Sequence, residues 1–134
     1  MCLNIIWYTS FIGGKEWKKQ PEVSVVFYRT ASREEVVREW LRGLDRADRN
    51  IIGQDLMRVQ LRWPIGMPLC RSLGDGLWEV RSLGGNRIAR VLLCFADDRL
   101  VVLHGFIKKT PKTPDAVLKL ARKRKGEFIK ERRS

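Results

Sequence analysis

The segment from Leu73 to Thr113 constrains the fold more than any other part of the chain, because it reads as three successive strands followed by a lysine-rich loop. Side chains in an extended chain alternate between two sides. In the first of these strands, Leu77 and Arg81 therefore project to one side and Trp78 to the other. One face can pack against a core while the opposite face presents charge.

Two short turns separate the three strands. Gly84-Gly85-Asn86 and Asp97-Asp98 are residues that supply a positive φ or the local hydrogen bonds of tight hairpins. The sheet should therefore be largely antiparallel.

The rest of the chain adds one strand and three helices to this sheet. Ser32 and Glu35 have the spacing of a capping box, Pro64 and Gly66 stop the second helix, and Thr113-Pro114 begins the last one. We predict strands at 23–28, 77–82, 87–96 and 99–107, and helices at 32–44, 47–63 and 116–130. The expected buried residues are Trp40, Leu56, Val59, Val80, Leu93 and Val101.

These elements predict an α+β fold, because two helices in a row precede the strands instead of alternating with them. It should contain a largely antiparallel four- to five-stranded sheet. A helical hairpin should cover one face, a basic groove should form on the other, and a basic helix should end the chain. Residues 23–134 are expected to form one domain, and residues 1–22 a variable N-terminal extension.

Charge indicates the class of partner. The 134 residues carry 27 Lys and Arg against 15 Asp and Glu, a net charge of +12 with a pI near 10.3. Residues 108–134 alone hold a net charge of +8. Such asymmetry favours a local surface that binds a polyanion.

Cysteine and histidine usage argues against metal and disulfide chemistry. Cys2, Cys70 and Cys94 are odd in number and far apart, and His104 is the single histidine. We therefore expect no metal site, no cofactor and a reducing, cytoplasmic environment. The apolar start at 1–14 is too short to span a membrane and does not have the form of a secretory signal.

Five motifs in series resemble the HigB-type (phage-derived, Gp49-like) branch of the RelE/ParE superfamily of bacterial toxins. They are VVFYRT, VREWLRGL, LWEVRS, RIARVLLC and LHGFIKKTPKTP, and they span Val25 to Lys125. The resemblance implies a RelE-like fold and a toxin of a type II toxin–antitoxin system. It further implies a ribosome-dependent mRNA endoribonuclease that inhibits translation, and a cognate helix-turn-helix antitoxin that forms a hetero-oligomer with it.

The candidate site lies around the first hairpin. Arg81, Arg87 and Arg90 sit on adjacent strands and could converge to clamp a phosphate. RelE-like toxins resemble this chain in carrying arginines where Arg81 and Arg87 stand, and basic residues where Lys108 and Lys109 follow the last strand. A lysine among cations can lose its proton more easily, which suits acid–base catalysis.

Alternatives remain open for each of these residues. The arginines could pair with Glu79 and other acids, and the lysines could bind phosphate without proton transfer. His104 could be catalytic, or it could be a hydrogen-bonded core histidine. Some superfamily members use a tyrosine or histidine in the C-terminal segment, and residues 108–134 contain neither.

Further basic residues should bind RNA without sequence preference, or simply form a solvated helix face. They are Arg90, Lys112, Lys119, Arg122, Lys123, Arg124 and Lys125. The expected partners are mRNA, the ribosome and the antitoxin, and no membrane. Two other functions stay possible: a ParE-like toxin that inhibits gyrase by contact, and a non-catalytic, phage-derived nucleic-acid-binding protein.

Overall fold

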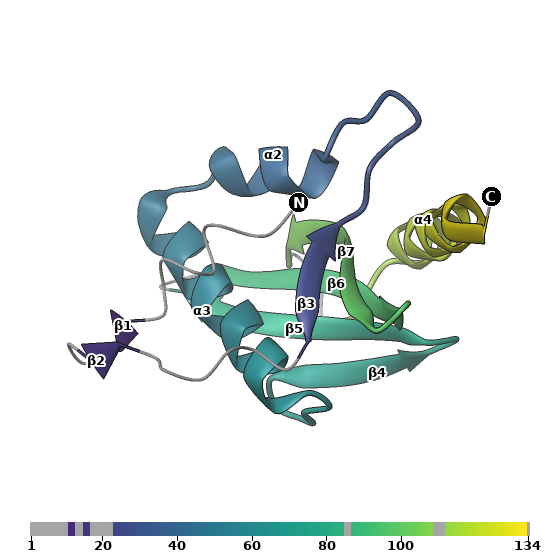
Figure 1. Ribbon diagram of the computed structural model, residues 1–134. Helices are drawn as coiled ribbons and strands as arrows, with labels where there is room; N and C mark the ends of the chain where they lie inside the picture. The colour runs from purple at the N-terminus through teal and green to yellow at the C-terminus, as the bar shows by residue number, and fades with distance from the viewer. Residues whose placement is uncertain (1–10, 13–14, 17–22, 85–86, 109–111, 134) are drawn as a thin grey trace.

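One five-stranded sheet forms the centre of the protein (Figure 1). The computed structural model describes residues 11–12, 15–16, 23–84, 87–108 and 112–133. The sheet has the order β3-β7-β6-β5-β4. Its strands are β3 (Ser24–Phe27), β4 (Cys70–Gly74), β5 (Leu77–Gly84), β6 (Arg87–Ala96) and β7 (Arg99–Ile107). β3 runs parallel to β7 and every other neighbouring pair is antiparallel, so the predicted α+β fold with a largely antiparallel sheet is confirmed.

The strands that the sequence predicts are present, and one more joins them. β6 and β7 have the predicted bounds, because Asp97 and Asp98 end one strand and begin the next. Both aspartates have positive φ values, 55° and 57°, as a tight turn requires. No strand is predicted at the position of β4, a short edge strand in which only Cys70 is buried.

The expected N-terminal extension is described only in part. Two-residue strands β1 (Phe11–Ile12) and β2 (Lys15–Glu16) pair with each other in antiparallel fashion. The rest of residues 1–22 lies outside the described residues.

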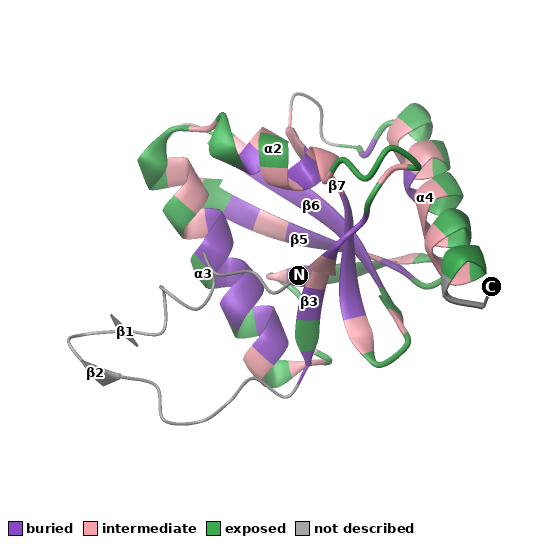
Figure 2. Ribbon diagram, turned by 45° about the horizontal axis from the view of Figure 1, so that its top comes forward, coloured by how far each residue is buried: buried purple, intermediate pink, exposed green. Residues whose placement is uncertain are grey.

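Helices α2 (Val36–Arg42) and α3 (Arg46–Arg62) cover one face of the sheet (Figure 2). Leu56 and Val59 of α3 are buried against Val80 and Leu93 of the sheet, as predicted. Trp40 is only partly buried, and its ring lies on β7. A Cβ added at Gly105 would come within 2.3 Å of that ring, so this contact depends on a glycine.

Helix α4 (Asp115–Arg133) packs on the opposite face, which corrects the expectation of a basic groove there. Buried Leu92, Val101 and Leu103 form a second core with Ala121 of α4. The reason lies in β6 and β7, which are apolar on both sides instead of alternating, so both faces need a cover. Val101, predicted to be buried, belongs to this second core.

The two predicted helix caps are wrong. Arg33 has a φ of 68°, which a right-handed helix does not allow, so α2 begins at Val36 and not at residue 32. The Ser32 hydroxyl interacts with Thr30 and Glu34. Thr113 lies one residue before the cap of α4, since the Pro114 carbonyl accepts the first backbone bonds of the helix, and its hydroxyl donates to the Glu79 carboxylate at 2.5 Å.

Candidate nucleic-acid-binding site

Three basic side chains lie on one face of the sheet near the β5–β6 hairpin. Arg81 and Arg90 are direct cross-strand partners, and Arg90 pairs in turn with Phe106 of β7. Direct antiparallel partners project to the same side, which is the side that α4 covers further along the strands. Lys108, two residues after Phe106, continues this face, and its backbone N–H donates to the Ile88 carbonyl at 2.7 Å. We call Arg81, Arg90 and Lys108 the basic cluster.

Arg90 is the buried member of the cluster. Arg90 and Glu79 each expose only 2 % of their side chains and form an ion pair through Arg90 Nη1 and Glu79 Oε1. The other carboxylate oxygen of Glu79 accepts the Thr113 hydroxyl hydrogen bond at 2.5 Å. Within the described part of the chain, Arg90 Nε and Nη2 are buried and have no hydrogen-bond partner.

The cluster carries more positive than negative charge. Arg81 and Lys108 are half-buried. Glu79 is the carboxylate whose charge acts on the pKa of Lys108. Desolvation lowers the pKa of Lys108, and the Arg90 and Arg81 guanidinium groups lower it further, while Glu79 acts in the opposite direction. An excess of cations with unused N–H donors is suited to an anionic ligand.

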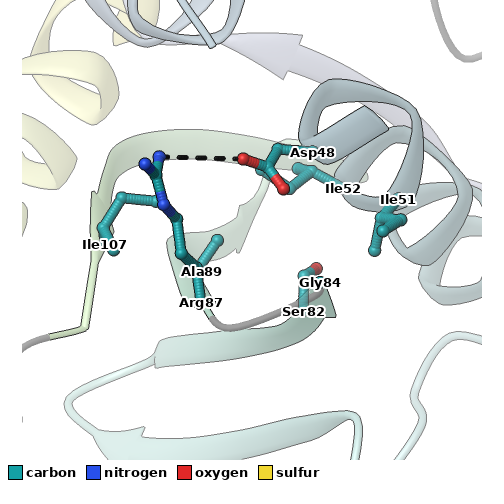
Figure 3. Close-up of a pocket in the computed structure, with 8 residues that line it drawn as sticks. All are labelled: Asp48, Ile51, Ile52, Ser82, Gly84, Arg87, Ala89 and Ile107. Atoms are coloured by element: carbon teal, nitrogen blue, oxygen red, sulfur yellow. Dashed lines mark ion pairs between the residues drawn. The ribbon is translucent and has the colours of Figure 1, made fainter. Parts of the chain in front are cut away.

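Arg87 lies on the other face of the sheet, so the predicted convergence of Arg81, Arg87 and Arg90 is wrong for Arg87. It stands three residues before Arg90 on the same strand, and an odd spacing puts two side chains on opposite sides. Its guanidinium lies 3.9 Å from the Asp48 carboxylate of α3, at a small cleft also lined by Ser82 and Ile107 (Figure 3).

His104 lies at the contact between the sheet and α4. Its Nδ1 is 3.4 Å from Arg124 Nη1, which also donates to the Leu103 carbonyl at 2.8 Å. Burial lowers the pKa of His104, and the neighbouring Arg124 lowers it further. These contacts match the alternative of a hydrogen-bonded core histidine, while its catalytic role stays a prediction.

The other predicted RNA-binding residues are distributed over α4 and the segment before it. Lys112, Lys119 and Lys123 are exposed. Arg122 pairs with Asp75 of the β4–β5 turn at 3.0 Å, and Lys125 binds the carbonyl of the same residue. Lys109, a predicted catalytic residue, lies outside the described residues.

The described cysteines are unsuited to nucleophilic chemistry. Cys70 and Cys94 are free and buried. Burial raises the pKa of each thiol to about 11, so the reactive thiolate form is suppressed. Cys94 instead packs in the core on the α4 side of the sheet.

Comparison with known families decides the affiliation. A family model described as "Phage derived protein Gp49-like (DUF891)" matches residues 39–126. The chain belongs to this Gp49-like family. The family is phage-derived and related to the HigB and RelE toxins. No curated protein shows significant similarity to the chain.

The Gp49-like match includes the whole basic cluster together with Glu79 and Thr113. It also covers α3, strands β4 to β7 and more than half of α4. Among the described residues, no helix is long and apolar enough to cross a membrane.

From the sequence, Glu79 is expected only as a possible ion-pair partner of the arginines, an alternative that its pair with Arg90 confirms, and Thr113 is not expected in the site. One signal for Glu79 was available: it alternates with Trp78 and Val80 and so shares a face with the buried Leu77. A carboxylate on a buried face needs a partner, and Arg90, on the same face of the neighbouring strand, supplies it. Nothing in the local sequence indicates that Thr113 reaches Glu79, 34 positions away.

Proposed function

We propose that this Gp49-like protein is the toxin of a type II toxin–antitoxin pair and cleaves mRNA on the ribosome. The observation that carries the proposal is the basic cluster, in which Arg81, Arg90 and Lys108 lie close enough for the two arginines to lower the pKa of the lysine, with Glu79 as the opposing carboxylate among the described residues. Membership of a family related to the HigB and RelE toxins supports the same conclusion.

In the proposed reaction, the ribose 2′-oxygen attacks the adjacent phosphorus as its proton passes to a water molecule. The bond to the 5′-oxygen breaks, and that oxygen takes up a proton, giving a 2′,3′-cyclic phosphate and a 5′-hydroxyl. Arg81 binds the non-bridging oxygens, where negative charge develops in the transition state. Lys108 has a lowered pKa and so releases a proton more readily, which makes it the candidate general acid for the 5′-oxygen.

The exposed basic side chains of α4 fit a second role in the same proposal. Lys119 and Lys123 would contact RNA phosphates through charge alone, without reading sequence. Lys109 follows Lys108 directly in the chain and is proposed to contact the same phosphate.

A toxin of this kind needs an inhibitor. We propose a helix-turn-helix antitoxin whose acidic segment binds the basic cluster or the exposed face of α4. Charge complementarity would mainly raise its association rate, so the rate should fall about tenfold or more between 0.05 M and 0.5 M salt. A reading frame for such a protein beside this gene would support the pairing.

Primer extension on mRNA from cells that express the protein tests the proposal. We expect new 5′ ends within translated regions, and their loss when Arg81 is replaced by alanine. Growth arrest with intact transcripts and blocked DNA replication would instead place the protein with the gyrase inhibitors.

A further inference from the structure

Burial of the Glu79–Arg90 ion pair in a small protein carries a large desolvation free energy. Removing two charges from water costs several kcal/mol per ion, and the attraction between them repays this only when their remaining polar atoms are also bonded. In the described part of the chain, Arg90 Nε and Nη2 have no such bonds. Apolar side chains of similar volume would stabilise this position at least as well.

The pair links the two strands of one hairpin, and Thr113 adds a third segment that is distant in the sequence. Glu79 lies on β5, Arg90 on β6, and Thr113 just before α4. The segment that begins with Lys108 is therefore held at two points. Lys108 is bonded to Ile88 through its backbone, and Thr113 is bonded to Glu79 through its hydroxyl.

We propose that Glu79 is a positioning residue of the nuclease site, which fixes Arg90 beside Lys108 and, through Thr113, joins the start of α4 to the sheet. The proposal rests on the function proposed above. It assigns no contact with RNA to Glu79, whose two oxygens are both occupied by protein donors.

Glu79 and Arg90 act on Lys108 with opposite signs. The described charged groups that influence the pKa of Lys108 are Arg90 on β6 and Arg81 and Glu79 on β5. Glu79→Gln keeps the shape and an acceptor oxygen but removes a negative charge, so it should lower the Lys108 pKa. Arg90→Met removes a positive charge and should raise it. If the pair were purely structural, the two substitutions would change the amount of folded protein and leave the Lys108 pKa unchanged in both variants.

The Thr113 bond has its own matched variants. Thr113→Val removes the hydroxyl at nearly constant volume, whereas Thr113→Ser retains it. We expect cleavage at saturating ribosome-bound mRNA to fall about tenfold in the valine variant, the cost of one hydrogen bond to a charged group. The serine variant should cleave like the wild-type protein.

The experiment combines two readouts on the full-length protein. NMR titration of the Lys108 side chain, in wild type, Glu79→Gln and Arg90→Met, follows the pKa directly and needs no activity. Single-turnover cleavage of mRNA on ribosomes is then measured against pH. We expect opposite pKa shifts in the two variants, and matching shifts in the pH–rate profile.

A double variant, Glu79→Leu with Arg90→Met, is the control that separates loss of folding from loss of positioning. It removes both buried charges, so it should fold as stably as the wild type while cleavage stays at least tenfold reduced. Full cleavage by this variant, or a Lys108 titration unmoved in both single variants, would overturn the positioning role. Failure of the wild-type protein to cleave mRNA under any condition would instead overturn the proposed function, whatever the titrations show.

Discussion

Two charged regions on the α4 side of the sheet differ in how completely their charges are matched. In the first, the basic cluster, Arg90 leaves two N–H groups unused among the described residues. In the second, which we call the helix junction, Tyr28, His104, Arg124 and Glu127 link the sheet to α4.

At the helix junction, the polar groups find partners in one another. The Tyr28 hydroxyl donates to Glu127 at 2.9 Å, and Arg124 bonds the Leu103 carbonyl and lies 5.3 Å from the centre of the Tyr28 ring. Matched polar groups hold a helix in place, whereas an excess of one charge attracts a ligand. We therefore expect the helix junction to be structural and the basic cluster to bind the ligand.

The largest expected effect comes from removing Arg81, a half-buried member of the basic cluster. Arg81→Ala should lower mRNA cleavage by about 10²-fold, as loss of one transition-state hydrogen-bond donor does in other enzymes. Its free energy of unfolding should change by less than about 0.5 kcal/mol, since no described side chain bonds to it. Single-turnover cleavage and urea denaturation measure the two quantities. Full cleavage by the variant would remove the cluster from the mechanism.

The helix junction should show the reverse result. Arg124→Ala should lower the free energy of unfolding by about 1.5–3 kcal/mol, because it removes a charged hydrogen-bond donor from a partly buried carbonyl. Cleavage per folded molecule should stay near the wild-type value. Lys130→Ala, an exposed change on the same helix, is the matched control and should be neutral in urea denaturation. A stable Arg124→Ala variant with lost cleavage would contradict the division.

The sheet could be read from the sequence because its signals are local. β6 and β7 are long apolar runs that end in turn residues, so their bounds follow from the residues themselves. β4 could not be predicted, because its five residues are mostly exposed and lack an apolar pattern. The cover provided by α4 could have been inferred from β6 and β7, since strands that are apolar on both faces need two covering layers.

The site was less predictable, because it depends on pairing between distant segments. The arginines at 81 and 90 could be proposed as neighbours once a hairpin was assumed, and their cross-strand register confirms that arrangement. The contact between Thr113 and Glu79 depends on the path of the chain after β7. The buried pair of Arg90 with Glu79, and the Thr113 bond to it, likewise join residues that no local sequence pattern brings together.

A smaller effect should appear in the pH dependence of stability. The pKa of His104 is lowered in the folded protein, chiefly by burial, while the unfolded chain keeps a value near 6.5. The unfolded state therefore binds the proton more readily, and stability falls as the pH drops through 6.5 toward the folded pKa.

His104→Gln should remove this loss. Thermal unfolding of both proteins at pH 7.5 and 5.5 isolates it, because other groups such as Asp55, whose pKa burial raises, contribute equally to both and cancel. An identical change in the two proteins would show that His104 does not titrate in this range.

The smallest expected effect concerns Arg87, and it tests whether the face of the sheet decides function. Arg87 is 58 % exposed and lies 3.9 Å from Asp48, a geometry worth less than about 1 kcal/mol. Arg87→Ala should therefore alter mRNA cleavage by less than about threefold, against about 10²-fold for Arg81→Ala. The two variants carry the same chemical change, Arg to Ala, on neighbouring strands. Single-turnover cleavage therefore compares the two faces of the sheet directly. Equal losses would mean that RNA reaches both faces of the hairpin, and that the catalytic role implied for Arg87 by the family resemblance outweighs its place beside α3.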